Sequence, residues 1–360
     1  QMIRRASRFA KDVRVCGCFA ERKGLKLDNM PFVTQKVGCV GKTALADITP
    51  SLTEKGFELA NIATVPVEDV KVFSSARAFV KIQDGCAGKC TYCIIPSLRG
   101  PLRSRPPEDI VAEVKRLVAG GCKEIILTGI ETAAYNYEPL YVLIERVSKI
   151  DGLKRIRLGS LDPNALSEGF IKTVASLPTV MPHFHISLQS GCDRILKLMR
   201  RPYTAADAKR RIDALKAAIP NVKLSADIIC SFPSESFDEL KETVRYLKDI
   251  KFSHIHAFSY SKRPDTPAAV MDGQIPEDEK KRRMRYFLDE CKAMENAVLD
   301  SRLGDADTVL VEKAENGYAI GHTEDFLEAK IKTSRPLNEG DLIKVSIIGK
   351  EGERLVCTEA

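Results

Sequence analysis

Three cysteines separated by three and two residues offer the sharpest chemistry in this sequence of 360 residues. Cys86, Cys90 and Cys93 stand in the run Cys-Ala-Gly-Lys-Cys-Thr-Tyr-Cys. Three thiolates at this spacing can bind three irons of a cubic 4Fe–4S cluster and leave the fourth iron open, as a catalytic metal centre requires. Gly85 and Gly88 would let the backbone fold closely around the inorganic core. The alternative is a zinc knuckle completed by a distant fourth cysteine.

The elements around the triplet must place it at the end of a strand. A strand is predicted at Phe79–Gln83, and a helix follows at Pro107–Ala119, where proline and acids occupy the first turn. Further strands are predicted at 124–128, 154–158, 183–188, 223–229 and 252–258, and further helices at 139–149, 165–175, 204–217 and 235–249. This alternation indicates parallel βα units. A doubly wound sheet fits the pattern equally well, although the regular spacing favours a barrel, whose strand ends carry the chemistry in such folds.

The C-terminal part follows a different pattern. A charged helix is predicted at Pro276–Ser301, and five short strands follow at 308–312, 318–322, 327–331, 342–348 and 355–358, which is typical of a small all-β barrel of the OB kind. Residues 300–360 carry eight basic and thirteen acidic residues, a net charge of −5, whereas the whole chain is at +7. Any polyanion site should therefore draw its positive charge mainly from residues 1–299.

Composition bounds the class of protein. Hydrophobic residues make up 44% and charged residues 29% of the chain, which is an ordinary globular balance. No apolar run is long enough for a membrane-spanning helix, and the start does not resemble a signal peptide. Eleven cysteines, an odd number in a large chain, favour a reducing compartment with metal or catalytic thiols over a disulfide scaffold. We therefore expect a soluble, cytoplasmic protein that does not bind membranes.

The cysteine triplet and the segments around it resemble the radical S-adenosylmethionine (SAM) methylthiotransferase family over nearly the whole chain. The resemblance rests on the triplet, on 94–100 (Ile-Ile-Pro-Ser-Leu-Arg-Gly) and on 102–105 (Leu-Arg-Ser-Arg). It implies a partial (β/α)6 TIM-like core at 76–299, the remnant of an N-terminal α/β methylthiotransferase domain at 1–75 and a C-terminal OB-like TRAM domain at 300–360. Cys86, Cys90 and Cys93 would hold the 4Fe–4S cluster that binds SAM. No other catalytic residue is assigned.

The resemblance also implies a reaction and its partners. The cluster would reduce SAM, and the resulting 5′-deoxyadenosyl radical would remove the hydrogen from C2 of adenine 37 in the anticodon loop of tRNA. Sulfur would come from a second 4Fe–4S cluster, and a second SAM would supply the methyl group. A reductant protein such as flavodoxin or ferredoxin would deliver electrons.

Three branches of the family look alike here. The segments 127–130, 155–163 and 183–191 are similar to the branch that acts on N6-threonylcarbamoyladenosine (t6A). The isopentenyladenosine branch typically has Gly-Gln-Asn where this chain has Gly129-Ile-Glu131, and the branch that modifies an aspartate of a ribosomal protein has Gln-Asp there. We therefore expect methylthiolation of t6A, with the other two substrates as alternatives.

The sequence departs from the family at two places. Cys18 matches the third cysteine of the second cluster, and the other two ligands would lie before Gln1, so we expect the front of the protein to be missing here. The family usually has glycine where Ser231 and Ser234 stand, which would permit close approach of the backbone to a cofactor. Asp227, on the preceding strand, could accept a hydrogen bond from a ribose hydroxyl or serve only as a structural partner.

Further candidates carry weaker signals. The pairs His183/His185 and His254/His256 each share a strand face and are expected to line the barrel rather than bind zinc. Arginines expected to contact tRNA phosphates, unless they are only solvated charges, are Arg99, Arg103, Arg105, Arg200 and Arg201. Donors expected for the carboxylate of t6A are Arg157, Ser160, Ser187 and Gln189, although an arginine on a strand such as Arg157 could equally be a buried ion-pair partner. Residues that the C-terminal barrel could offer to RNA are Lys330, Lys332, Arg335, Tyr318 and Phe326. Cysteines expected only to pack are Cys16, Cys39, Cys122, Cys192, Cys230, Cys291 and Cys357.

Overall fold

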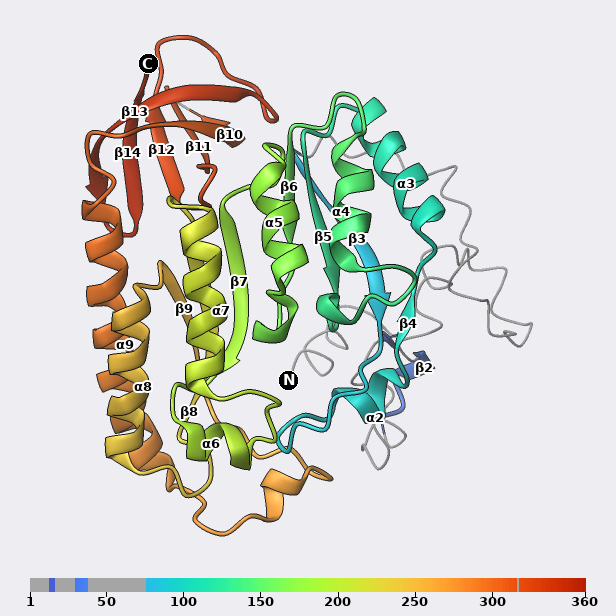
Figure 1. The fold of residues 1–360 in the computed structure, drawn as a ribbon, viewed down its shortest axis with the longest axis vertical. Helices are drawn as coiled ribbons and strands as arrows, with labels where there is room; N and C mark the ends of the chain where they lie inside the picture. The colour runs from blue at the N-terminus through green and yellow to red at the C-terminus, as the bar shows by residue number, and fades with distance from the viewer. Residues whose placement is uncertain (1–12, 17–29, 38–75, 316) are drawn as a thin grey trace. The chain divides into compact units, whose positions relative to one another are not determined.

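The computed structural model describes residues 13–16, 30–37, 76–315 and 317–360 (Figure 1). The contacts divide the chain into two compact units. Gly85–Ala87 and Ile94–Pro101 group with the N-terminal part of the chain, and the remaining described residues from 76 onward form the second unit. In the first unit, strand β1 (Val13–Cys16) pairs in parallel with β2 (Val33–Val37), and a short helix, α2, spans Ile95–Arg99.

Six parallel strands of the second unit, among its described residues, form an incomplete barrel. They are β3 (Arg77–Asp84), β5 (Glu124–Gly129), β6 (Arg155–Leu158), β7 (His183–Gln189), β8 (Lys223–Cys230) and β9 (His254–Ser259). β3, β5 and β6 pair in that order, as do β7, β8 and β9. Two isolated bridges, Ile156 with Val180 and Leu161 with Ile186, connect the two groups. A two-residue strand, β4 (Arg103–Ser104), pairs antiparallel with the end of β3. The predicted partial barrel is confirmed.

Helices cover the outside of this half-barrel, as Figure 1 shows. They are α3 (Pro107–Ala119), α4 (Leu140–Ser148), α5 (Glu168–Ser176), α6 (Asp193–Leu198), α7 (Ala205–Ala218), α8 (Phe237–Ile250) and α9 (Glu277–Asp300). Each of the longer helices turns an apolar stripe towards the strands, and the shared core includes fully buried Ile125, Ile156 and Ile186. Burial of this apolar layer is the main force that holds the strands in position.

The C-terminal strands close into a small barrel. They are β10 (Ala306–Glu315), β11 (Tyr318–His322), β12 (Glu328–Lys332), β13 (Leu342–Glu351) and β14 (Arg354–Glu359), in the order β10-β11-β12-β14-β13. This five-stranded closed barrel confirms the prediction of an OB-like module. It lies at the end of the half-barrel where β7 begins (Figure 1).

Buried arginines join the C-terminal barrel to the half-barrel. Arg155 donates to the carbonyl oxygens of Thr308 and His322, at 2.5 and 3.2 Å. Arg157 donates to the carbonyl oxygens of residues 323 and 324, at 2.8 and 3.0 Å. Glu124, which is fully buried, balances both charges and also pairs with Arg77. None of the described helices is both long and apolar enough to cross a membrane.

Candidate functional site

The cysteine loop begins where β3 ends. Cys86, Cys90 and Cys93 are all half-buried and not in disulfides, and the contact division places Cys86 in the first unit and the other two in the second. Within the second unit, the amide of Cys93 donates to the carbonyl of Cys90 at 3.2 Å, which forms a tight turn. Buried Thr91 fixes this turn, because its hydroxyl donates to the carbonyl of Leu198 at 2.8 Å.

A guanidinium lies against one of the three sulfurs. Arg201 Nη1 donates to Cys90 Sγ at 3.1 Å, and Arg201 Nη2 is 2.6 Å from Asp162 Oδ2. The side chain of Arg201 is only 11% exposed. The hydrogen bond from this cation orients the Cys90 sulfur.

The donor set therefore fits an iron–sulfur cluster by its chemistry. It offers three cysteines on one short loop, none of them in a disulfide, with a cation beside one sulfur. Across the described ranges, no three His, Cys, Asp or Glu side chains are arranged around a common point as the ligands of one metal ion. The fit rests on the type and spacing of the donors, and not on a preformed ligand cage.

The cysteine predicted for a second cluster lies outside the described residues. Cys18 falls in the range 17–29, and Cys39 also lies outside them; Cys16 is the last residue of β1. The other cysteines expected to pack are buried and free, as predicted: Cys122, Cys192, Cys230, Cys291 and Cys357. Burial raises the pKa of the Cys291 thiol to about 12, which suits a packing residue and not a nucleophile.

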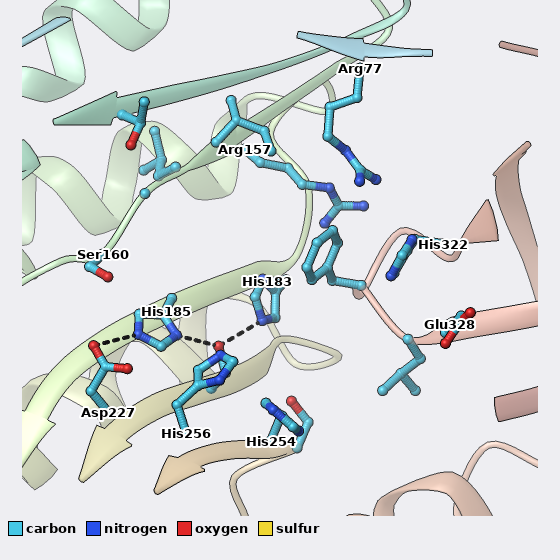
Figure 2. Close-up of a pocket in the computed structure, with 18 of the residues that line it drawn as sticks. Arg77, Arg157, Ser160, His183, His185, Asp227, His254, His256, His322 and Glu328 are labelled. Carbon is cyan, nitrogen blue, oxygen red and sulfur yellow. Dashed lines mark hydrogen bonds and ion pairs between the residues drawn. The ribbon is translucent and has the colours of Figure 1, made fainter. Parts of the chain in front are cut away.

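A cavity of about 710 Å³ occupies the interior of the half-barrel, and all five histidines of the chain line it. His183 and His185 come from β7, His254 and His256 from β9, and His322 from the C-terminal barrel (Figure 2). The alternation of side chains along each strand explains why the paired histidines point to the same side. The prediction that these pairs line the barrel is confirmed.

Hydrogen bonds fix most of the imidazoles. Ser225 Oγ lies 3.1 Å from His183 Nε2 and 2.8 Å from His185 Nδ1, and His185 Nε2 is 3.1 Å from Asp227 Oδ2 (Figure 2). Burial, together with the nearby Arg157, holds the pKa of His183 well below its usual range, so this ring is neutral at physiological pH.

The two histidines of β9 differ in charge. A hydrogen bond from His254 to Glu295 raises the pKa of His254. Burial and the neighbouring His254 lower the pKa of His256. No hydrogen bond is formed by the His256 ring to another described side chain, although it packs 4.5 Å from His254 and 5.1 Å from His185, measured between ring centroids.

Asp227 connects this cavity to a second one near the cysteine loop. Asp227 and Phe258 line both, and the second cavity, of about 270 Å³, also contains Tyr92, Gln189 and Tyr260. Asp227 therefore pairs with a histidine and also faces both cavities. It can serve as a structural partner of His185 and still accept a hydrogen bond from a ligand. Gln189, predicted as a donor, has a φ of 70°, a conformation that turns the chain sharply at the end of β7.

Several predicted arginines have other tasks. Arg157 is an ion-pair partner of Glu124, at 2.9 Å, and not a free donor for a substrate carboxylate, because its charge and its Nη donors are used at the C-terminal barrel. Arg105 pairs with Glu113 at 2.6 Å. Arg201 is buried against Cys90 and not available to phosphates, whereas Arg200 is exposed. Ser160 lines the large cavity, as its predicted role requires.

The C-terminal barrel uses its predicted RNA contacts partly for packing. Phe326 stacks on His322 with ring centroids 4.5 Å apart and lies 5.0 Å from His183, so it packs towards the half-barrel. Lys330 pairs with Glu351 at 2.9 Å and lies over the ring of Tyr318, which is exposed.

Two features of the site were not found in the sequence. The contact of Arg201 with Cys90 joins residues 111 positions apart, and no local pattern reports it. Ser231 and Ser234 both have a left-handed backbone, with a φ of 62° each. The sequence could have predicted this conformation, because both serines stand where the family usually has glycine.

The comparisons with known proteins agree with this geometry. Residues 80–247 match the Radical SAM superfamily. The chain is 33% identical to threonylcarbamoyladenosine tRNA methylthiotransferase MtaB of Bacillus subtilis, over 97% of this chain and 81% of that protein. It is 35% identical to tRNA-2-methylthio-N(6)-dimethylallyladenosine synthase of Hydrogenobaculum sp., over 96% of this chain and 79% of that one. Among solved structures, the radical S-adenosylmethionine methyltransferase TsrM of Kitasatospora setae has a TM-score of 0.48 and 17% identity, over 54% of this chain and 38% of that one.

Proposed function

This chain belongs to the radical SAM methylthiotransferase family, and from that premise we propose that it transfers a methylthio group to C2 of N6-threonylcarbamoyladenosine in tRNA. Cys86, Cys90 and Cys93 would hold the SAM-binding 4Fe–4S cluster. When bound, that cluster supplies the electron that cleaves SAM to a 5′-deoxyadenosyl radical. Cys18 would contribute to a second cluster.

The chain's own residues position and enclose the reaction. The turn at Thr91 holds Cys90 and Cys93 in place. Enclosure of the reacting base in the half-barrel would keep bulk water from it. We assign the smaller cavity, between Tyr92 and Tyr260, to SAM, because it adjoins the cysteine loop and offers aromatic walls with polar edges. The target base would then occupy the larger cavity, which shares Asp227 and Phe258 with the smaller one.

Hydrogen-bonding side chains set among the largely apolar walls of the large cavity are the observation that carries the choice of base. A threonylcarbamoyl group brings a carboxylate, a hydroxyl and two N–H groups, whereas an isopentenyl group is apolar. Thr128, Ser160 and His256 offer hydrogen-bonding atoms towards the cavity, and Asp227 offers a carboxylate oxygen. A cavity built with such groups would reject an apolar substituent, since its polar atoms would lose water without gaining partners.

Isopentenyladenosine remains the second candidate, since relatives named for the dimethylallyl modification are as similar to the chain as those named for t6A. For tRNA itself, the positive charge of residues 1–299 supports binding through phosphates. Electrons would come from a small reductant protein such as flavodoxin or ferredoxin.

Nucleoside mass spectrometry tests the proposal. The gene is expressed in cells that make t6A and isopentenyladenosine but lack their own tRNA methylthiotransferases. We expect 2-methylthio-t6A to appear and the isopentenyl product to stay at least about tenfold lower, which corresponds to about 1.4 kcal/mol of transition-state contact. Cys90→Ala is the control and should yield neither product. Equal amounts of the two products would refute the choice of base, and no product from the unaltered gene would refute the proposal as a whole.

A further inference from the structure

Arg201 is held in one orientation by contacts on every side of its guanidinium. Its Nε donates to the hydroxyl of Tyr203 at 2.9 Å, and its Nη2 contacts Asp162 Oδ2 at 2.6 Å and the carbonyl oxygen of Ser187 at 3.2 Å. The remaining nitrogen, Nη1, points to Cys90 Sγ at 3.1 Å. A planar, fully charged fork fixed in this way delivers a directed hydrogen bond and not only a diffuse charge.

The partners of Arg201 are themselves fixed. Asp162 caps the short helix that follows β6, because its Oδ1 accepts the amide of Asn164 at 2.9 Å. The hydroxyl of Tyr203 lies 3.0 Å from the carbonyl oxygens of both Ser187 and Leu188, at the end of β7, and the Tyr203 side chain is buried. The hydrogen bond to Cys90 is therefore built into the ends of two strands of the half-barrel.

We propose that Arg201 is a positioning residue for the iron–sulfur cluster: it orients the Cys90 sulfur and raises the reduction potential of the cluster that this sulfur would hold. The inference rests on the proposed function, since it needs the cluster on the cysteine triplet. Hydrogen bonds to cluster sulfurs and nearby net charge are two of the factors that set such potentials. Reduction adds one negative charge, so a donor and cation at the sulfur stabilises the reduced form more than the oxidised form.

Asp162 opposes part of this effect. Its carboxylate lies against the far side of the same guanidinium and offsets its charge. Removing the charge of Arg201 and removing the charge of Asp162 should therefore move the potential in opposite directions. A purely structural role for the pair would not produce this difference in sign.

The test is a redox titration followed by electron paramagnetic resonance, on protein whose cluster has been reconstituted without oxygen. Four variants are compared with the unaltered chain at equal iron content: Arg201→Gln, Arg201→Lys, Asp162→Asn and Arg200→Gln. Arg200 is the matched control, because it is the adjacent arginine and its side chain is exposed.

We expect Arg201→Gln to lower the midpoint potential by about 59 mV or more, which is a tenfold change in a one-electron equilibrium. Arg201→Lys should lower it less, since it keeps the charge but loses the fork. Asp162→Asn should raise the potential, and Arg200→Gln should leave it unchanged. An unshifted potential in Arg201→Gln with full iron content, or a shift of the same sign in Asp162→Asn, would overturn the inference.

The same experiment separates this inference from its premise. If the unaltered chain takes up no cluster, or Cys90→Ala takes up as much as the unaltered chain, the assignment of the cysteine triplet is wrong. If Arg201→Gln does not fold, the sign of the shift in Asp162→Asn, which keeps the arginine, still decides the matter.

Discussion

Glu235 is a carboxyl group that the fold has almost removed from water. Its side chain follows β8, is only 3% exposed and accepts the amide of Ser231 at 2.5 Å. Burial raises its pKa to about 7, and the hydrogen bond from Ser231 and the nearby Arg283 offset only part of that effect. The folded chain therefore holds a proton on Glu235 at a pH where the unfolded chain has lost it.

This proton makes stability depend on pH. Between about pH 4.5 and 7 the folded state binds more protons at Glu235 than the unfolded state, so its contribution to the free energy of unfolding falls as pH rises through that window. The shift corresponds to about 3 kcal/mol at most. In urea unfolding at pH 5 and pH 8, Glu235→Gln, which stays neutral at both, should gain stability relative to the unaltered chain as the pH rises, by up to about 3 kcal/mol. A difference between the two proteins that is independent of pH would contradict this.

Ser234 carries a backbone conformation that suits glycine. With a φ of 62° it lies in the left-handed region, which costs about 1–2 kcal/mol for a residue with a Cβ atom. Its hydroxyl accepts only a long contact from Arg194, at 3.3 Å. Both Ser234→Gly and Ser234→Ala lose that contact, but only glycine relieves the backbone.

We therefore expect Ser234→Gly to be more stable than Ser234→Ala by about 1 kcal/mol, after the larger entropy of glycine in the unfolded chain is taken into account. Thermal unfolding of the two variants measures this difference directly. If Ser234→Ala is as stable as Ser234→Gly, the left-handed backbone at Ser234 does not have the free-energy cost assigned to it.

At the scale of the elements, local sequence predicts a helix best where its start is marked. α3 begins at Pro107 as predicted, and α7 and α8 begin one residue after Thr204 and Ser236, each with a reciprocal capping box. The sequence did not reveal α6 or β2. α6 has six residues and no side-chain cap, and it exists because Ile195 and Leu196 are buried by the rest of the chain.

The cap of α7 gives a prediction at this scale. Thr204 Oγ1 accepts the amide of Asp207 at 3.1 Å, and the Asp207 carboxylate accepts the amide of Thr204 at 3.3 Å. Thr204→Ala should lower the free energy of unfolding by about 1 kcal/mol, because the first turn loses an acceptor. Ser176→Ala is the control and should change it by less than about 0.5 kcal/mol, because Ser176 is exposed at the end of α5 and its hydroxyl donates only to the carbonyl of Thr173 in the same turn. Equal changes in the free energy of unfolding for Thr204→Ala and Ser176→Ala, measured in urea, would mean that the capping box of α7 does not stabilise the protein.

At the scale of the whole molecule, one buried glutamate joins the half-barrel to the C-terminal barrel. Glu124 pairs with Arg77, Arg155 and Arg157, and these arginines reach across to the C-terminal strands. The sequence predicted both modules from their patterning, but not this joint, because its three arginines and one glutamate come from three different strands and meet only after folding. The alternative considered for Arg157, a buried ion-pair partner, is the one that the structure supports.

Glu124→Gln should therefore destabilise the protein by about 3–5 kcal/mol, since it leaves buried arginine charge without its counter-charge. Glu145→Gln is the matched control, because Glu145 pairs with Lys149 on the exposed face of α4 and should cost less than about 0.5 kcal/mol. Urea unfolding of both variants measures the contrast. A Glu124→Gln variant as stable as Glu145→Gln would show that the buried network does not hold the modules together.

The gathering of every histidine in one cavity gives this protein a built-in reporter. Selective isotope labelling of histidine would yield imidazole resonances that all originate from the half-barrel interior, with no background from elsewhere in the chain. Among them, His254 should protonate at a higher pH than His256 and His183. Chemical-shift changes on adding a nucleoside would then register entry into that interior, whatever happens at the outer surface.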